Sequence, residues 1–133
     1  MKRYFVDSDF LVAVFNFKDA SHDRAIDTFK RLDSDEVELW GSNLIQQESA
    51  TVVSHRIGMD AARDFVKRLA VDVDRFVDID KSLEKPAWGI FLKQTKKGCS
   101  FVDCANLAVI ERYKLDGILT FDEFYPKAIR IGV

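Results

Sequence analysis

The chain has 133 residues, 47% of them hydrophobic, and a formal net charge of −2. This length fits one domain spanning 1–133, and the charge excludes a broadly basic protein, so attraction for a nucleic acid would need a local patch or bound metal. With no signal peptide and no apolar run of about 18 residues in the sequence, we expect a cytoplasmic protein.

Short apolar segments alternate with longer stretches of helical periodicity along the chain. In chain order, the expected elements are a strand at 3–7, a helix within 8–15, a helix at 21–33, a strand at 37–42, helices at 43–58 and 60–71, a strand at 75–80, helices at 81–98 and 100–115, and strands at 118–121 and 128–133. Ser8 and Ser21 are expected to cap the first two helices.

This alternation predicts an α/β fold with a mostly parallel sheet of four or five strands, covered by helices on both faces. Ligands bind such sheets at the carboxyl ends of the strands. Asp7 follows the strand "YFV" and Asp122 follows the strand "ILTF". Both aspartates are therefore expected at the ligand-binding edge, although a helix cap or a turn residue would also explain either one alone.

Two further acids stand on helix faces that are otherwise apolar. Glu48 has Leu44 four residues before it and Val52 four residues after it, so it shares their face. Asp103 and Asn106 are the only polar residues in 101–110. A buried carboxylate is costly unless it is paired, hydrogen-bonded or bound to metal. A capping role for Asp103 in the first turn is the competing explanation.

These four carboxylates, Asp7, Glu48, Asp103 and Asp122, are expected to converge in one crevice. Their mutual repulsion would raise their pKa values unless cations bind among them. An oxygen-rich site without His or Cys favours Mg²⁺ or Mn²⁺, which can activate water for phosphodiester hydrolysis. Ser8 and Thr120 adjoin two of the acids, and either hydroxyl is a candidate to orient a water or a phosphate.

Four segments, "FVDSDFLVA", "NLIQQESATVV", "SFVDCANLAV" and "ILTFDEFY", resemble in order and spacing the four acidic motifs of PIN-domain ribonucleases, most closely the VapC-type toxins of toxin–antitoxin pairs. The resemblance implies a three-layer α/β sandwich and a Mg²⁺- or Mn²⁺-dependent endoribonuclease. It also implies a homodimer and an antitoxin protein that occupies the active-site groove.

Carried over by motif, the resemblance makes Asp7, Glu48, Asp103 and Asp122 the catalytic, metal-binding acids, with Ser8 and Thr120 at supporting hydroxyl positions. Two positions depart from the common pattern. Asp9 stands where many members have Asn or Ser, and Asn106 stands near a position that is His in some. Asp9 adds negative charge near the site, which would alter metal affinity or substrate preference.

Basic residues near the acids are candidates for contacts with RNA phosphates. Lys93, Lys96 and Lys97 precede Asp103, and a second group after Glu48 consists of Arg56, Arg63, Lys67 and Arg68. Lysines at a helix end are also common as ordinary solvated charges, so the pattern alone leaves both explanations open.

Other functions remain open from the sequence. "FVDSDFL" also resembles the start of haloacid-dehalogenase-type phosphatases, with Asp7 as nucleophile and Asp9 as acid or base, but Leu11 is unusual there and Glu48 and Asp103 are left without a role. A receiver-like phosphorylation switch is a second alternative, with Asp78 or Asp80 as phosphoacceptor, but no lysine stands after the last strand where such a switch needs one. A PIN-like module that binds a partner without catalysis is the third alternative.

Overall fold

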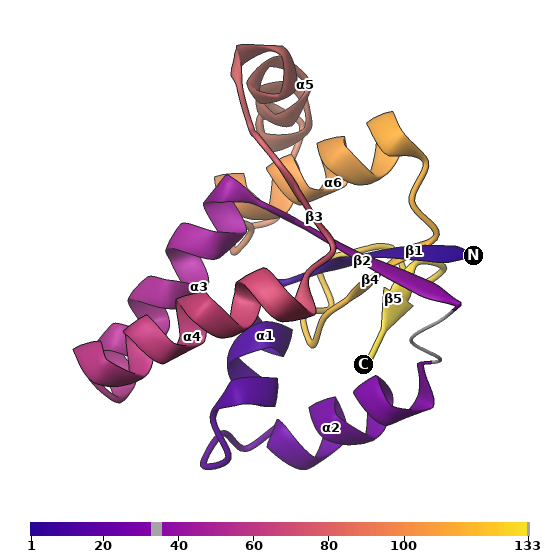
Figure 1. The fold of residues 1–133 in the computed structure, drawn as a ribbon. Helices are drawn as coiled ribbons and strands as arrows, with labels where there is room; N and C mark the ends of the chain where they lie inside the picture. Colours follow the sequence, from indigo (N-terminus) through magenta and orange to yellow (C-terminus); the bar gives the residue numbers. More distant parts are fainter. Residues whose placement is uncertain (33–35, 133) are drawn as a thin grey trace.

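The computed structural model describes residues 1–32 and 36–132 and contains one five-stranded sheet with helices on both sides (Figure 1). The strands are β1 (Lys2–Val6), β2 (Val37–Ser42), β3 (Arg75–Val77), β4 (Gly117–Leu119) and β5 (Arg130–Ile131). The helices are α1 (Ser8–Phe15), α2 (His22–Arg31), α3 (Asn43–Arg56), α4 (Met59–Asp72), α5 (Lys81–Leu92) and α6 (Phe101–Tyr113).

The strands are ordered β3-β2-β1-β4-β5, and every neighbouring pair is parallel. In the register, Phe5 of β1 lies opposite Trp40 of β2 on one side and Ile118 of β4 on the other. The chain therefore begins in the middle of the sheet, and the end of β1 lies beside the end of β4. This confirms the predicted α/β class and its parallel sheet.

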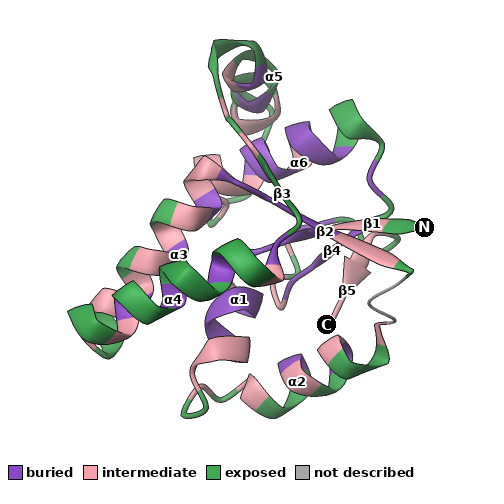
Figure 2. Cartoon of the chain, viewed as in Figure 1, coloured by how far each residue is buried: buried purple, intermediate pink, exposed green. Residues whose placement is uncertain are grey.

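The core lies on both faces of the central strands. Phe5, Val6, Ile118 and Leu119 are at most 1% exposed, as expected for strands covered on both sides. Figure 1 shows α6, with α5 packed beside it, on one side of the sheet and α1 and α2 on the other. Buried residues follow the strands and the faces of α1 and α6 that meet them (Figure 2).

Several predicted boundaries differ from the structure, and local chemistry explains two of them. Asp7, not Ser8, is the N-cap of α1, because its carboxylate already accepts the Ser8 main-chain N–H at 2.9 Å. Ser21 stands at the N-cap of α2 without a side-chain cap bond. Helix α3 stops at Arg56, and Gly58, with a φ of 138°, begins the next helix as its N-cap.

Three further elements are shorter than predicted. Strand β3 ends at Val77 because Asp80 then caps α5, and α5 ends at Leu92 rather than reaching Gly98. Strand β4 ends at Leu119, so Asp122 lies three residues beyond it, in a turn. The final residues of the predicted elements 21–33 and 128–133 lie outside the described residues. Within the described residues, no helix combines the length and apolarity needed to cross a membrane.

Candidate active site

Asp7 is held at the junction of β1 and α1 by bonds to two segments of the chain. Its main-chain N–H donates to the Leu119 carbonyl at 2.9 Å, which continues the β1–β4 ladder. One carboxylate oxygen accepts the Ser8 N–H, and the other accepts the Thr120 hydroxyl at 2.9 Å. The side chain is only 4% exposed, so its position is fixed by burial as well as by hydrogen bonds.

Asp9 and Asp122 are both hydrogen-bonded to the residues that follow β4. Asp9 Oδ2 accepts the Phe121 main-chain N–H at 3.1 Å, whereas Asp9 Oδ1 is buried without a hydrogen-bond partner among the described residues. The Asp122 N–H donates to the Thr120 hydroxyl at 3.0 Å, and Asp122 Oδ1 accepts the Phe124 N–H at 2.9 Å. Thr120 therefore links Asp7 and Asp122 through one hydroxyl.

Glu48 reaches the site through Ser8. Helices α1 and α3 pack together, and the Ser8 hydroxyl donates a hydrogen bond to Glu48 Oε1. Glu48 is half-buried on α3, in line with its place on an otherwise apolar face. The Ser8 hydroxyl thus serves an acid of the site rather than capping a helix.

Asp103 is anchored from both of its carboxylate oxygens. Oδ2 accepts the Ser100 N–H at 2.9 Å, while the Asp103 N–H donates to the Ser100 hydroxyl, so the two residues form a capping box at the start of α6. Oδ1 accepts the Tyr125 hydroxyl at 3.2 Å. The capping explanation for Asp103 is therefore correct, but it accounts for only one of the two oxygens.

Tyr125 is a residue of this site that the sequence analysis did not select. It is 1% exposed, and its hydroxyl accepts a hydrogen bond from Asn106 Nδ2 at 3.0 Å while donating to Asp103. Asn106 is also 1% exposed, and its Oδ1 is buried without a partner among the described residues. The available signal was an aromatic residue with a polar tip beside four other acidic or aromatic residues in "FDEFY".

Burial and mutual repulsion change the acidity of the buried aspartates. Desolvation, and next the charge of Asp9, raises the pKa of Asp7 to about 8, with a smaller contribution from Asp103. Desolvation raises the pKa of Asp9 to about 6, with contributions from Asp122 and Asp103. Desolvation and the charges of Asp7 and Asp103 also raise the pKa of Tyr125, so its hydroxyl remains a donor. Four aspartates therefore influence one another electrostatically in this site.

The donor set has the chemistry of a site for a hard divalent cation. Its ligating atoms would be carboxylate oxygens, and Asp7 and Asp9 are both destabilised in their charged forms by neighbouring aspartates. Asp9 Oδ1 and Asn106 Oδ1 are buried oxygens that accept no hydrogen bond from the described residues. In residues 1–32 and 36–132, however, no three Asp, Glu, His or Cys side chains are grouped closely enough to hold a metal ion as they stand. The donor types therefore suit the ion, but the side chains would have to come closer together to coordinate it.

The predicted basic residues lie in two separate pockets and along α4. Lys96 and Lys97 line a pocket of about 440 Å³ together with Asp122, and Lys93 is the C-cap of α5 just before that segment. Arg56 lines a separate pocket that also contains Ser8 and Asp9. By contrast, Arg63 and Arg68 pair with Asp60 and Asp72 along α4, so part of the second basic group is neutralised within its own helix.

Comparison with known proteins assigns this arrangement to a family. The model of the PIN domain matches residues 4–129. The chain belongs to the PIN-domain family. Curated relatives from Mycobacterium tuberculosis, named as 23S rRNA-specific endonuclease VapC20, are 30% identical over 125 residues, which is 93% of this chain and 92% of theirs.

Solved structures agree with the family assignment. The crystal structure of M. tuberculosis VapC20, described as a sarcin–ricin loop cleaving toxin, superposes with a TM-score of 0.85 at 25% identity over 98% of both chains. VapBC2 from Rickettsia felis, solved with a DNA fragment from its promoter, gives a TM-score of 0.72 at 12% identity over 97% of each chain, and this likeness supports the PIN fold alone.

Proposed function

We propose that this PIN domain is a metal-dependent endoribonuclease and the toxin of a toxin–antitoxin pair. The observation that carries the proposal is the mutual influence of the aspartates: the charges of Asp9 and Asp103 raise the pKa of Asp7, and the charges of Asp122 and Asp103 raise the pKa of Asp9. Glu48 joins them through Ser8. Such a set of carboxylates is costly for the fold, which favours a role in binding cations over a structural role.

In this proposal Asp7, Glu48, Asp103 and Asp122 are the metal-binding and catalytic acids. Bound Mg²⁺ or Mn²⁺ would lower the pKa of a water and stabilise negative charge on the phosphate. Thr120 fixes the orientation of Asp7, Ser8 fixes that of Glu48, and Tyr125 fixes that of Asp103. Thr120, Ser8 and Tyr125 therefore act as positioning residues.

The remaining expectations belong to the same proposal. A cytoplasmic location, a homodimer and an antitoxin partner follow from the resemblance to VapC-type toxins, and a toxin–antitoxin complex from Klebsiella pneumoniae is among the solved structures that share this fold. Ribosomal RNA is the first substrate to test, because the VapC20 relatives are named for 23S rRNA. Lys93, Lys96 and Lys97 are suited to hold the RNA backbone beside Asp122. The phosphatase alternative is set aside because the chain belongs to the PIN family.

The test is cleavage of 23S rRNA and of a mixed RNA pool by the purified protein with Mg²⁺, with Mn²⁺ and with EDTA. Cuts that need metal and are lost in Asp103→Asn are expected. Asp64→Asn, which makes the same charge change at an exposed position of α4, should cut like the wild type. A folded wild-type protein that cuts no RNA with either metal would instead support a partner-binding module without catalysis.

A further inference from the structure

A pocket of about 420 Å³ adjoins the acids on the side of α1 and α3. Ser8 and Asp9 form its inner wall, and Asp19, Ser21 and Arg56 form its outer wall. Val12, Val52 and Phe121 supply the apolar surface between them. Because the pocket shares Ser8 and Asp9 with the candidate site, a group bound there would lie next to the reacting phosphate.

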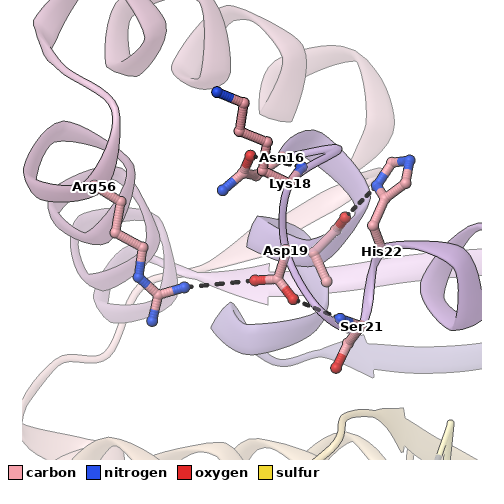
Figure 3. Close-up of polar contacts among 7 residues, drawn as sticks. Asn16, Lys18, Asp19, Ser21, His22 and Arg56 are labelled. Atoms are coloured by element: carbon pink, nitrogen blue, oxygen red, sulfur yellow. Dashed lines mark hydrogen bonds and ion pairs between the residues drawn. The ribbon is translucent and has the colours of Figure 1, made fainter.

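The outer wall is held in a defined conformation by the segment between α1 and α2. Asp19 Oδ1 accepts the Ser21 N–H at 2.8 Å, and the Asp19 carbonyl accepts the His22 N–H at 3.0 Å. His22 Nδ1 lies 2.7 Å from the Ala13 carbonyl, which ties the start of α2 to α1. Figure 3 shows Asp19 between Ser21 on one side and Arg56, which reaches over from α3, on the other.

Asp19 and Arg56 both keep hydrogen-bonding capacity toward the pocket. Their only direct contact is between Arg56 Nη1 and Asp19 Oδ2, at a long 3.4 Å. A guanidinium has five N–H donors and a carboxylate about four acceptor positions, so each has several left. The Asp19 side chain is 16% exposed and the Arg56 side chain 59% exposed, so the acceptor is the more fixed of the two groups.

The charges favour a neutral occupant that is rich in hydrogen bonds. Two carboxylates, Asp9 and Asp19, and one guanidinium face the pocket, a balance that disfavours a phosphate. A nucleobase fits the volume, the apolar walls and the mixed donors and acceptors. Among the bases, guanine has two adjacent N–H donors that suit one carboxylate and a neighbouring oxygen that suits a guanidinium.

We propose that this pocket binds a guanine base of a nucleotide flanking the scissile phosphate, with Asp19 accepting from its Watson–Crick edge and Arg56 donating to its oxygen. The inference rests on the proposed nuclease function. It assigns Asp19 and Arg56 to the choice of cleavage sequence and leaves bond cleavage itself to the acids.

The experiment has two steps. Sequencing of the ends produced from a mixed RNA pool is expected to show guanine at one of the two positions next to the cut. A short single-stranded RNA carrying that site is then compared with the same RNA containing inosine, which lacks the 2-amino group. We expect the wild type to cleave the inosine substrate at least about five-fold more slowly in kcat/KM.

The variants separate base recognition from general charge effects. Asp19→Asn and Arg56→Gln are each expected to lose most of the discrimination between guanine and inosine. Asp23→Asn and Arg31→Gln make the same charge changes at exposed positions outside the pocket and should keep this discrimination. Binding of the two RNAs to Asp103→Asn, followed by fluorescence polarisation, should show the same preference without cleavage.

The two proposals fail differently. If the wild type makes metal-dependent cuts with no base preference, or if Asp19→Asn keeps the guanine preference, the pocket assignment is wrong while the nuclease stands. We would then infer that the pocket binds a protein partner and not a base. If no RNA is cut, and the Asp103→Asn protein binds a guanine-containing single strand no better than the same strand with inosine, both proposals are overturned.

Discussion

Two strand-to-helix junctions of this protein carry the same local chemistry and differ in electrostatics. Asp7 follows β1 and caps α1, and Asp80 follows β3 and caps α5. Each carboxylate accepts main-chain N–H groups of the helix it precedes. Hydrogen bonds from Ser82 and Leu83 lower the pKa of the exposed Asp80, whereas desolvation and a neighbouring charge raise the pKa of Asp7 to about 8.

The difference comes from the positions of the two strands in the sheet. Strand β1 is central and β3 is at the edge of the sheet. Asp7, directly after β1, is therefore enclosed by β4 and the segments beyond it, whereas Asp80, which follows β3, faces solvent. An N-cap needs only one of its carboxylate oxygens to accept the main-chain N–H. At the buried junction, the other oxygen of Asp7 accepts the Thr120 hydroxyl and lies near other acids, whose negative charges would stabilise a cation.

The largest expected effect separates the two junctions by activity. Asp7→Asn should lower metal-dependent RNA cleavage by more than about 100-fold, because substitutions of groups that only support metal ligands already cost about 10–100-fold. Asp80→Asn should leave cleavage unchanged within a factor of about two. Initial rates with Mn²⁺ and a defined RNA substrate measure both. Equal losses in both variants would mean that capping, and not metal binding, explains the role of Asp7.

The second prediction uses the pH dependence of stability without metal. A folded-state pKa raised above the unfolded value means that the folded protein binds more protons between pH 4 and 8. Stability from protonated Asp7 is thus complete below about pH 4 and lost as the pH rises through about 8, at about 1.4 kcal/mol per pKa unit.

In EDTA, we therefore expect the wild type to lose up to a few kcal/mol of unfolding free energy over this range and Asp7→Asn to lose clearly less. Asp9, with a pKa of about 6, contributes a smaller decline in the lower half of the same window. Urea unfolding at pH 5, 6, 7 and 8 measures both. Parallel curves for wild type and Asp7→Asn would show that Asp7 is ionised in the metal-free protein.

The sequence predicted the fold class and the elements, because hydrophobic periodicity and strand–helix alternation are local signals. It also selected Asp7 and Asp103, and the charge of Asp103 acts on Asp7 in the fold. It did not identify the bond between Thr120 and Asp7, since the two residues are 113 positions apart and meet only because β4 pairs with β1. Tyr125 and the pocket residue Asp19 were missed for the same reason, as each acquires its partner from a distant segment.

The third prediction concerns Asp103. One of its carboxylate oxygens forms the cap of α6, and the other accepts the buried Tyr125 hydroxyl. Tyr125→Phe keeps the ring and removes the bond to Asp103 Oδ1 together with the bond that the hydroxyl accepts from Asn106. We expect apparent Mn²⁺ affinity, measured by calorimetry, and cleavage to fall together by about 10-fold or more. Tyr113→Phe, at a more exposed ring on α6, is the control and should change neither. A stability loss in Tyr125→Phe without a change in Mn²⁺ affinity would limit Tyr125 to a packing role.

The smallest expected effect is at the exposed junction. Asp80→Ala removes the acceptor for the Ser82 and Leu83 N–H groups, so the first turn of α5 should be weakened and Tm at pH 7 should fall by about 2–5 °C. Because the pKa of Asp80 is lowered on folding, its contribution exists above the ordinary aspartate pKa and is lost as the pH falls. The Tm difference between Asp80→Ala and wild type should therefore shrink below about pH 4, opposite in sign to the dependence at Asp7. A difference that stays constant with pH would mean that the ionised Asp80 carboxylate is not what stabilises the first turn of α5.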